Sequence, residues 1–423
     1  MGRYQRRTDG DEEARATPLE LFYDLVFVFA ITQVSHILLD DLTWTGAGHA
    51  ALALLVVWWA WNYTTWVTNE LDPDAIPVRL LLIAIMLASL AMAVAIPEAF
   101  GKYGLLFAGS YVAIQVGRHL FLTFVSADSG TIERERAGRI LTWFAASAVP
   151  WIAGGLADGS ARTALWLVAI AIDLTAPLVL YWVPGRERLS YDTWTVETSH
   201  FAERFELFMI IAFGETIVLT GATTSKLDLD TARFTAFALA FLATAAMWWL
   251  YFDYVTRIAK RRLELAPNRT QLARDAYTYL HVVMVAGVIL SAVGDELVIA
   301  HPTDVLPDAE VAVVAAGPAL YLLAHVLFRL RMAGTISRKR LGGALACVVA
   351  GLVGFVAPAL VLAALLVGIL VAVIAAERIA EARRRGRGEP SPLERLKALD
   401  APGAPGRRVS DAGCRTRAPD TAA

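Results

Sequence analysis

Two long apolar runs without any charge constrain the fold of this chain more than any other feature. Residues 80–96 contain no Asp, Glu, Lys or Arg, and neither do residues 345–376. A helix needs roughly 20 apolar residues to cross the hydrocarbon core of a bilayer. Only 18% of the 423 residues are charged and 57% are hydrophobic, whereas a soluble domain carries about 25% charged residues. The sequence therefore predicts an integral membrane protein.

The apolar runs are expected to be helices, which makes the fold class all-α. Backbone groups inside lipid must be paired within their own segment, and a β-barrel would alternate apolar and polar residues, which these runs do not. We predict about twelve transmembrane helices, with boundaries that are approximate. They cover residues 18–39, 47–67, 79–97, 102–125, 139–157, 162–183, 200–222, 233–256, 276–298, 309–330, 341–357 and 359–379.

The distribution of Lys and Arg predicts the orientation. The even-numbered loops between these helices are rich in both residues, whereas the odd-numbered loops carry only Lys102, Arg162, Lys226 and Arg233. Loops rich in Lys and Arg remain on the cytoplasmic side. Both termini are therefore predicted to be cytoplasmic, which requires an even number of membrane crossings.

The two halves of the chain resemble each other in sequence. Residues 20–22 and 206–208 both read Glu-Leu-Phe, and Trp-Trp-x-Trp at 58–61 is matched by Trp-Trp-x-Tyr at 248–251. Two halves of six helices that start on the same side would be parallel repeats. The predicted organisation is a basic cytoplasmic N-terminal tail (1–17), a first six-helix repeat (18–183), a cytoplasmic linker (184–199), a second six-helix repeat (200–380) and a disordered cytoplasmic tail (381–423).

Several ionisable residues fall inside the predicted helices. A charge at the centre of the bilayer costs about 2.5–3.5 kcal/mol, so each such residue needs a partner or water. Glu20 and Asp24 lie one helical turn apart, and Arg118 has a matching depth from the same side. We predict that Glu20, Asp24 and Arg118 form a buried ionic network that locks the first and fourth helices together rather than acting directly in transport. In the alternative, Glu20 and Arg118 reach the membrane interface with their long side chains.

A second group of residues forms a candidate substrate or proton site. Its members are Asp173, Glu203, Glu206, Glu215 and His119. Asp173 and Glu215 are expected nearest the midplane of the membrane, which favours them within this group. The Trp-rich segments of the second and eighth helices are expected to pack between helices, with an aromatic ligand platform as the alternative.

The sequence lacks the motifs of soluble enzymes. It contains no His-Glu-x-x-His, no P-loop, no Gly-x-Gly-x-x-Gly and no Gly-x-Ser-x-Gly. Its two cysteines, Cys347 and Cys414, have no metal-binding spacing. We therefore expect no enzymatic activity, no metal and no cofactor.

Three segments resemble a known family. Residues 16–30 (Ala-Thr-Pro-Leu-Glu-Leu-Phe-Tyr-Asp-Leu-Val-Phe-Val-Phe-Ala) are similar to the opening of the bacterial low temperature requirement protein A family. Residues 117–119 (Gly-Arg-His) and the segment from His200 to Thr216 look like its other recurrent motifs. The resemblance covers about residues 14–380 and implies a multi-pass protein of the bacterial cell (inner) membrane. It implies no particular molecular activity.

Three classes of function fit these features to different degrees. Twelve spans, duplication and buried carboxylates favour a transporter or channel for an ion or small solute. A non-transporting scaffold or regulator that acts through its basic tail is the alternative, and an intramembrane enzyme has no supporting residues. The expected partners are the lipid bilayer and an ion or small-molecule substrate, not nucleic acid, and the oligomeric state stays open.

Overall fold

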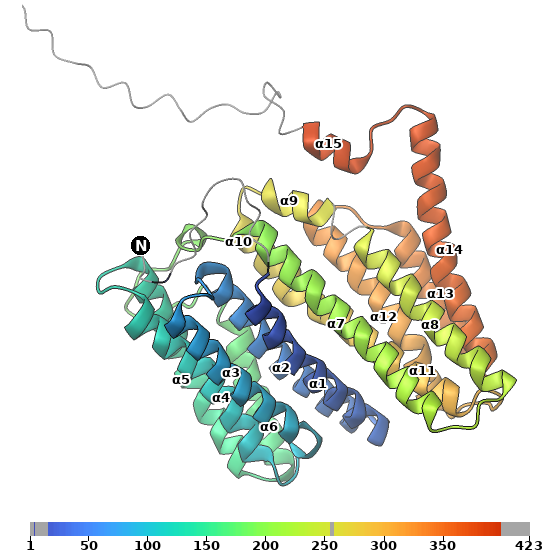
Figure 1. The fold of residues 1–423 in the computed structure, drawn as a ribbon, viewed down its shortest axis with the longest axis horizontal. Helices are drawn as coiled ribbons and strands as arrows, with labels where there is room; N and C mark the ends of the chain where they lie inside the picture. The colour runs from blue at the N-terminus through green and yellow to red at the C-terminus, as the bar shows by residue number, and fades with distance from the viewer. Residues whose placement is uncertain (1–3, 5–15, 254–257, 399–423) are drawn as a thin grey trace, which may run out of the picture. The chain divides into compact units, whose positions relative to one another are not determined.

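The computed structural model describes Tyr4 and residues 16–253 and 258–398, and these residues are almost entirely helical (Figure 1). Helix accounts for 81% of the structure, and the described part of the chain contains no strand. The predicted all-α class is therefore confirmed. Residues up to Glu377 belong to one compact unit, and those from Arg378 onward to a second.

Six long helices make up the first half. They are α1 (Pro18–Asp40), α2 (Trp44–Glu70), α3 (Ile76–Ala95), α4 (Gly104–Phe121), α5 (Ile132–Leu156) and α6 (Gly159–Thr175). A 3-10 turn, η1 (Ile96–Glu98), follows α3, and a π-helical turn, η2 (Leu122–Ser126), extends α4. Helices that follow one another in the chain pack together here: α3 contacts α4, α4 contacts α5 and α5 contacts α6.

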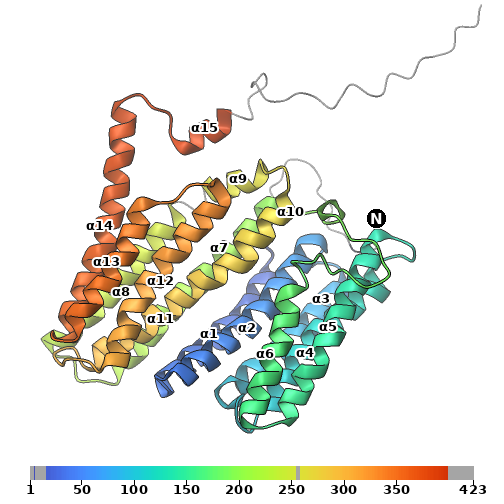
Figure 2. The same cartoon turned by 180° about the vertical axis from the view of Figure 1, so that it is seen from behind.

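The second half begins after a linker that contains the short η3 (Tyr191–Thr193). Its helices are α7 (Thr198–Ser225), α8 (Thr231–Phe252), the short α9 (Lys260–Glu264) and α10 (Arg269–Leu272), α11 (His281–Ala300), α12 (Asp308–Ala333), α13 (Arg338–Gly354), α14 (Ala359–Gly386) and α15 (Pro392–Ala398). A π-helical segment, η5 (Ala273–Leu280), leads into α11. The two halves meet where α1 and α2 contact α7 and α11 (Figures 1 and 2).

Eight of the helical segments are long and apolar enough to cross a membrane. These segments contain α1, α3, α4, α7, α8, α11, α12 and α14. Large apolar side chains also face outward, such as Leu87, Val149 and Val356, which are 71%, 70% and 80% exposed. An outer surface of this kind is typical of contact with lipid tails. The protein is therefore a membrane protein with several apolar spanning helices.

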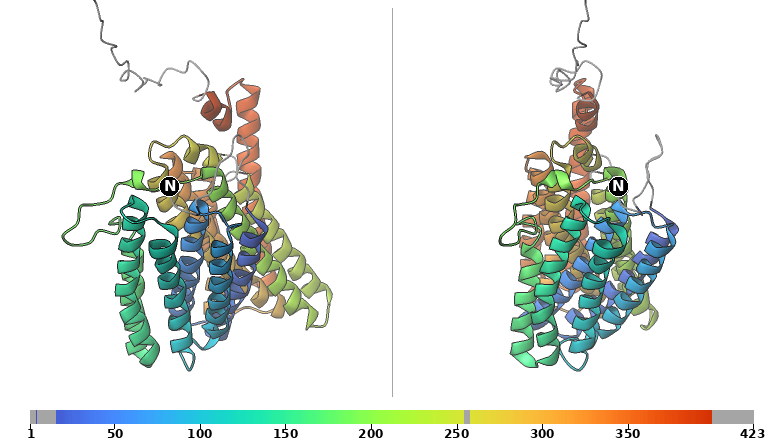
Figure 3. Two further views of the ribbon diagram at one scale, coloured as in Figure 1. Left: turned by 60° about the vertical axis from the view of Figure 1, so that its left-hand side comes forward. Right: turned by 90° about the vertical axis from the view of Figure 1, so that its left-hand side faces the viewer.

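The other long helices, α2, α5, α6 and α13, fall outside that set for identifiable reasons. Helices α6 and α13 have 17 residues each. The first turns of α5 carry Glu133, Glu135 and Arg136, and α2 contains many Trp, Thr and Asn residues. All four run alongside the spanning helices (Figure 3).

Tryptophans fill the centre of the molecule in the first half. Trp58, Trp59 and Trp61 of α2 are at most 1% exposed, and Trp58 Nε1 donates to the Thr278 carbonyl at 2.7 Å. These residues pack between helices, as the sequence predicts. The matching residues of α8 are not buried in this way, since Trp248 and Trp249 are both 46% exposed.

Glycines allow α11 and α12 to approach each other closely. A Cβ atom at Gly287 would lie 2.7 Å from the Tyr321 backbone nitrogen, and one at Gly317 would lie 2.6 Å from the Ser291 backbone nitrogen. Small residues at such crossings are how helices pack in membranes, where no hydrophobic force drives them together. This pair forms the most closely packed part of the second half.

The tail predicted to be disordered from residue 381 is partly helical, which corrects that expectation. Helix α14 continues to Gly386, where Arg385 pairs with Glu381 one turn earlier at 2.5 Å. In α15, Ser391 Oγ accepts from the Glu394 backbone nitrogen, and the Glu394 carboxylate accepts from the Ser391 nitrogen. This reciprocal cap starts a helix where composition alone suggested none. Residues 399–423 lie outside the described part of the chain.

Candidate functional site

The candidate site is a seam of polar side chains between α1 and α7, the first helices of the two halves. The two helices lie side by side. Polar contacts recur along the two helices in the same order, from Glu20 with His200 to Asp24 with Arg204 and then Thr32 with Glu215. Residue numbers rise together on both sides, so α1 and α7 run parallel.

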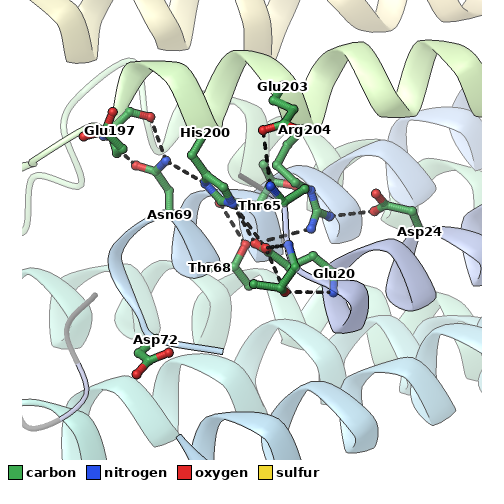
Figure 4. Close-up of polar contacts among 12 residues, drawn as sticks. Glu20, Asp24, Thr65, Thr68, Asn69, Asp72, Glu197, His200, Glu203 and Arg204 are labelled. Carbon is green, nitrogen blue, oxygen red and sulfur yellow. Dashed lines mark hydrogen bonds and ion pairs between the residues drawn. The ribbon is translucent and has the colours of Figure 1, made fainter. Parts of the chain in front are cut away.

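Glu20 occupies the first turn of α1, and the local sequence places it there. Thr17 caps the helix by accepting from the Glu20 backbone nitrogen at 3.3 Å, and Glu20 Oε2 accepts from the Thr17 nitrogen at 2.8 Å. This capping box fixes the Glu20 carboxylate beside α7. There, Oε1 lies 3.0 Å from His200 Nε2 and 3.4 Å from Arg204 Nη1 (Figure 4).

Asp24 lies one turn deeper and shares the same arginine. Its Oδ1 accepts from Arg204 Nη2 at 2.6 Å and from Trp61 Nε1 at 2.8 Å. Arg204 is fully buried, and its guanidinium bridges the carboxylates of Glu20 and Asp24 (Figure 4). The second carboxylate oxygen of Asp24, Oδ2, is buried and has no hydrogen-bond partner among the described residues.

The hydrogen bonds around His200 define its tautomer. Asn69 Oδ1 accepts from the Glu197 backbone nitrogen at 2.9 Å, so the other end of this amide is its NH₂ group. That group donates to the Glu197 carbonyl and lies 3.1 Å from His200 Nδ1, which must therefore be an acceptor. The ring proton is then on Nε2, from which it is donated to Glu20. His200 is thus a neutral donor in the seam.

Glu215 forms the far part of the seam. Its Oε2 accepts from Thr32 Oγ1 of α1 at 2.6 Å, and the residue is 0% exposed. The other oxygen, Oε1, is buried without a hydrogen-bond partner in the part of the chain that the structure describes. Glu215 and Asp24 therefore share one property, which is a buried carboxylate oxygen that no donor satisfies.

Arg118 lies outside this network, which corrects the predicted grouping of Glu20, Asp24 and Arg118. Its guanidinium donates to Thr64 Oγ1 at 2.8 Å, binds the Gln115 side chain and lies 5.4 Å from the centre of the Tyr63 ring. Helix α4 contacts α2 and α3, whereas α1 contacts α7. The arginine that pairs with Glu20 and Asp24 is therefore Arg204 of α7, not Arg118 of α4.

Sequence reasoning passed over Arg204, the residue that joins the seam. A usable signal was present, because His200 and Arg204 are spaced by one turn like Glu20 and Asp24. Both pairs also begin a helix on the same predicted side of the membrane. An acidic pair and a basic pair with the same one-turn spacing and the same depth in the membrane can face each other when their helices run parallel.

The other predicted site residues are distributed over different parts of the fold. Glu203 accepts from the Ala16 backbone nitrogen at 3.2 Å and belongs to the entrance of the seam. Glu206 is half-buried on α7. Asp173 lies within the first half, where it accepts from Tyr111 Oη at 2.8 Å and Trp151 Nε1 at 3.0 Å. His119 contacts the Gln115 carbonyl at 2.8 Å, away from the seam.

Comparisons with known proteins identify the family. Residues 15–375 match the family described as bacterial low temperature requirement A protein (LtrA). An uncharacterized protein of Rhizobium meliloti is 38% identical over 335 residues, which cover 79% of each chain. No solved structure matches. The chain belongs to the low temperature requirement A family.

Proposed function

We propose that this member of the low temperature requirement A family transports a proton or another small cation along the α1–α7 seam. The observation that carries the proposal is that two unsatisfied buried carboxylate oxygens, Asp24 Oδ2 and Glu215 Oε1, lie along one seam, whereas others such as Asp173 Oδ1 and Asp295 Oδ2 lie elsewhere in the described chain. A buried acceptor without a donor costs about 1–3 kcal/mol, and more when it is charged. A proton or cation at these oxygens relieves that cost. Ionisable residues at membrane depth are a common feature of ion pathways.

The length of the seam also supports a pathway. Sixteen residues separate Ala16 from Thr32, which corresponds to about 24 Å along a helix, against a hydrocarbon core of about 30 Å. Polar contacts at Ala16, Glu20, Asp24 and Thr32 are spread over this distance. The seam also lies where the two halves meet, so a small movement of one half against the other would alter every contact in it.

The finer topology belongs to the same proposal. We propose twelve crossings, formed by α1–α8 and α11–α14, with both termini cytoplasmic. The order of contacts supports two parallel repeats, since α1 contacts α2 and α3 as α7 contacts α8 and α11. In the same way, α3 contacts α4 and α4 contacts α5, as α11 contacts α12 and α12 contacts α13. The parallel course of α1 and α7 favours this relation over an inverted repeat.

The alternative is a scaffold or regulator without transport. The basic residues at the end of α14, Arg383, Arg384 and Arg385, favour it, because such clusters bind anionic lipid headgroups. In that case the seam would only hold the two halves together. Under either proposal the chain acts without enzymatic chemistry, and its partners are the bilayer and, for transport, the ion.

Flux measurements in liposomes distinguish the two. The full-length protein is reconstituted with a trapped pH-sensitive dye, and a proton gradient is imposed with the membrane potential clamped. We expect Asp24→Asn and Glu215→Gln to lower the initial flux by about tenfold or more, the effect of roughly 1.4 kcal/mol on a barrier. Asp74→Asn is the matched control, because this aspartate is exposed and pairs with exposed Arg79. If H⁺, Na⁺ and K⁺ flux all equal that of protein-free liposomes, the transport proposal fails and the scaffold remains.

A further inference from the structure

A cavity with an aromatic wall lies beneath the linker that joins the two halves. It encloses about 990 Å³ of empty space, part of which is open to solvent. Its walls come from α2, α4, η2, α5, the segment after α6, the linker, α10 and η5, and no residue of α1 or α7 lines it. The aromatic members are Tyr63, Trp66, Tyr181, Tyr191 and Trp194.

One buried side chain in this cavity has an unused hydrogen-bond donor. Trp66 Nε1 can only donate, and it donates to Thr278 Oγ1 at 3.0 Å. Thr278 Oγ1 in turn donates to Asn62 Oδ1 at 3.1 Å. Asn62 Nδ2 is then an NH₂ group, 1% exposed as a residue and without a partner among the described residues.

Acceptor groups line the same cavity. The Nδ1 atom of His119 donates to the Gln115 carbonyl at 2.8 Å, so Nε2 of the neutral ring is an acceptor. The hydroxyls of Tyr63 and Tyr181 lie 2.8 Å apart, and since one donates to the other, the second keeps a free hydrogen. The cavity thus offers both donors and acceptors of hydrogen bonds against aromatic walls.

The two arginines that line the cavity are already paired. Arg136 binds the Glu70 carboxylate and the Thr193 carbonyl. Arg274 binds Asp275 at 2.6 Å and the Pro177 carbonyl at 2.9 Å. An anion would find no unpaired guanidinium here.

The aromatic walls offer little further attraction to an organic cation. Guanidinium groups already lie over three of the aromatic rings, at 5.4 Å for Tyr63, 5.4 Å for Trp194 and 5.3 Å for Tyr191. These rings are therefore already engaged in cation–π contacts. A neutral ligand avoids both problems.

The backbone at the cavity is also held in an unusual conformation. Leu180 and Tyr181 have φ values of 53° and 51°, which non-glycine residues rarely adopt. Both line the cavity. Such strain persists only where surrounding contacts impose it, and it is concentrated at ligand and active sites.

We infer that this cavity is a binding site for a neutral aromatic small molecule that carries both a hydrogen-bond donor and an acceptor, as a primary carboxamide does. The aromatic walls take up the ring, Asn62 Nδ2 donates to the acceptor of the ligand, and His119 Nε2 or a tyrosine hydroxyl accepts from its donor. The site is independent of the transport proposal, because it shares no residue with the seam.

Three probes of one size test the ligand class. Benzamide, benzoate and benzylamine differ mainly in charge at neutral pH, and their binding to the full-length protein in nanodiscs is measured by isothermal titration calorimetry. We expect saturable one-to-one binding of benzamide, and binding of the two charged probes that is at least about tenfold weaker, since benzoate finds no unpaired guanidinium and benzylamine finds three of the five rings already engaged. Absence of saturable benzamide binding, or equal binding of a charged probe, overturns the inference.

Two substitutions test the location. Asn62→Leu removes the donor and should weaken benzamide binding by about fivefold to tenfold. Ala137→Phe places a ring into the cavity from its buried wall and should abolish binding. His49→Phe is the control, because this histidine is on α2 but stacks on Phe100 outside the cavity. Unchanged binding in both cavity variants would place the probe elsewhere, and the charge series on the wild-type protein decides the case if a variant fails to fold.

Discussion

Replacing Arg204 tests the seam most directly, because this side chain serves two buried carboxylates. It lies 2.6 Å from Asp24 and 3.4 Å from Glu20, and all three residues are at most 1% exposed. Removing one partner of a buried ion pair costs about 3–5 kcal/mol, since the remaining charge is uncompensated. We expect Arg204→Met to lower the free energy of unfolding by this amount. Asp24→Asn should cost less, because Glu20 still faces Arg204 and the amide oxygen can accept from Trp61.

A double-mutant cycle isolates the interaction from other effects of the substitutions. Asp24→Asn combined with Arg204→Met should lose less than the sum of the single losses, with a coupling energy of about 1–3 kcal/mol. Recovery stays incomplete because Glu20 retains only His200 as a partner on α7. The control pair is Asp74 and Arg79, which lie 2.8 Å apart but are 76% and 49% exposed. An exposed pair of this kind should couple by only about 0–1 kcal/mol.

Unfolding by SDS in mixed micelles, followed by tryptophan fluorescence, supplies the free energies for both cycles. The two pairs have the same residue types and similar distances, so burial is the property that distinguishes them. Combining Asp24→Asn with Arg118→Leu should give losses that add within about 0.5 kcal/mol, because these residues do not touch. A seam coupling no larger than that of the exposed pair, or strong coupling of Asp24 to Arg118, would refute the reasoning.

Three other outcomes are expected. Gly287→Val should sharply lower the yield of folded protein, because its Cβ would meet the backbone of α12, whereas Gly109→Ala, which has open space around it, should be tolerated; size-exclusion chromatography measures both. In a background without the native cysteines, Arg188→Cys should react with an impermeant thiol reagent only after permeabilisation and Lys226→Cys in intact cells; the reverse pattern would invert the proposed orientation. Asp173→Asn should keep ion flux in liposomes, since it lies away from the seam, and a loss as large as that of the seam variants would move the pathway into the first half.

Local properties of the sequence were enough to predict the helical class and the burial of the carboxylates. An apolar run must be a helix in lipid whatever its neighbours are, and the spacing of Glu20 and Asp24 places both on one face of α1. The residue that pairs with that face could not be predicted in the same way, because it depends on which helices touch. Depth alone could not distinguish Arg118 of α4 from Arg204 of α7, since both are compatible with the same level of the membrane.

The matching Trp-rich motifs likewise did not imply that their residues have the same surroundings. Trp58 and Trp59 are buried and Trp248 and Trp249 are exposed, although the motifs match. Helix α2 contacts α1, α4, α6, α7 and α11, because it lies at the junction of the halves, whereas α8 contacts α7 and α11. Burial of these tryptophans thus depends on where their helix lies in the molecule, which the motif does not encode.

At the seam, the first helices of the two halves contribute different residues. If both halves presented the same residues to each other, like charges would face like charges; instead α1 contributes Glu20 and Asp24, and α7 contributes His200 and Arg204. This complementarity fixes the register of the two helices. A shift by one turn, about 5.4 Å, would place Arg204 beside the apolar Val28 and leave a buried carboxylate unpaired. These contacts favour arrangements in which Arg204 keeps a carboxylate partner, and under the transport proposal a proton or cation at Asp24 would weaken that constraint.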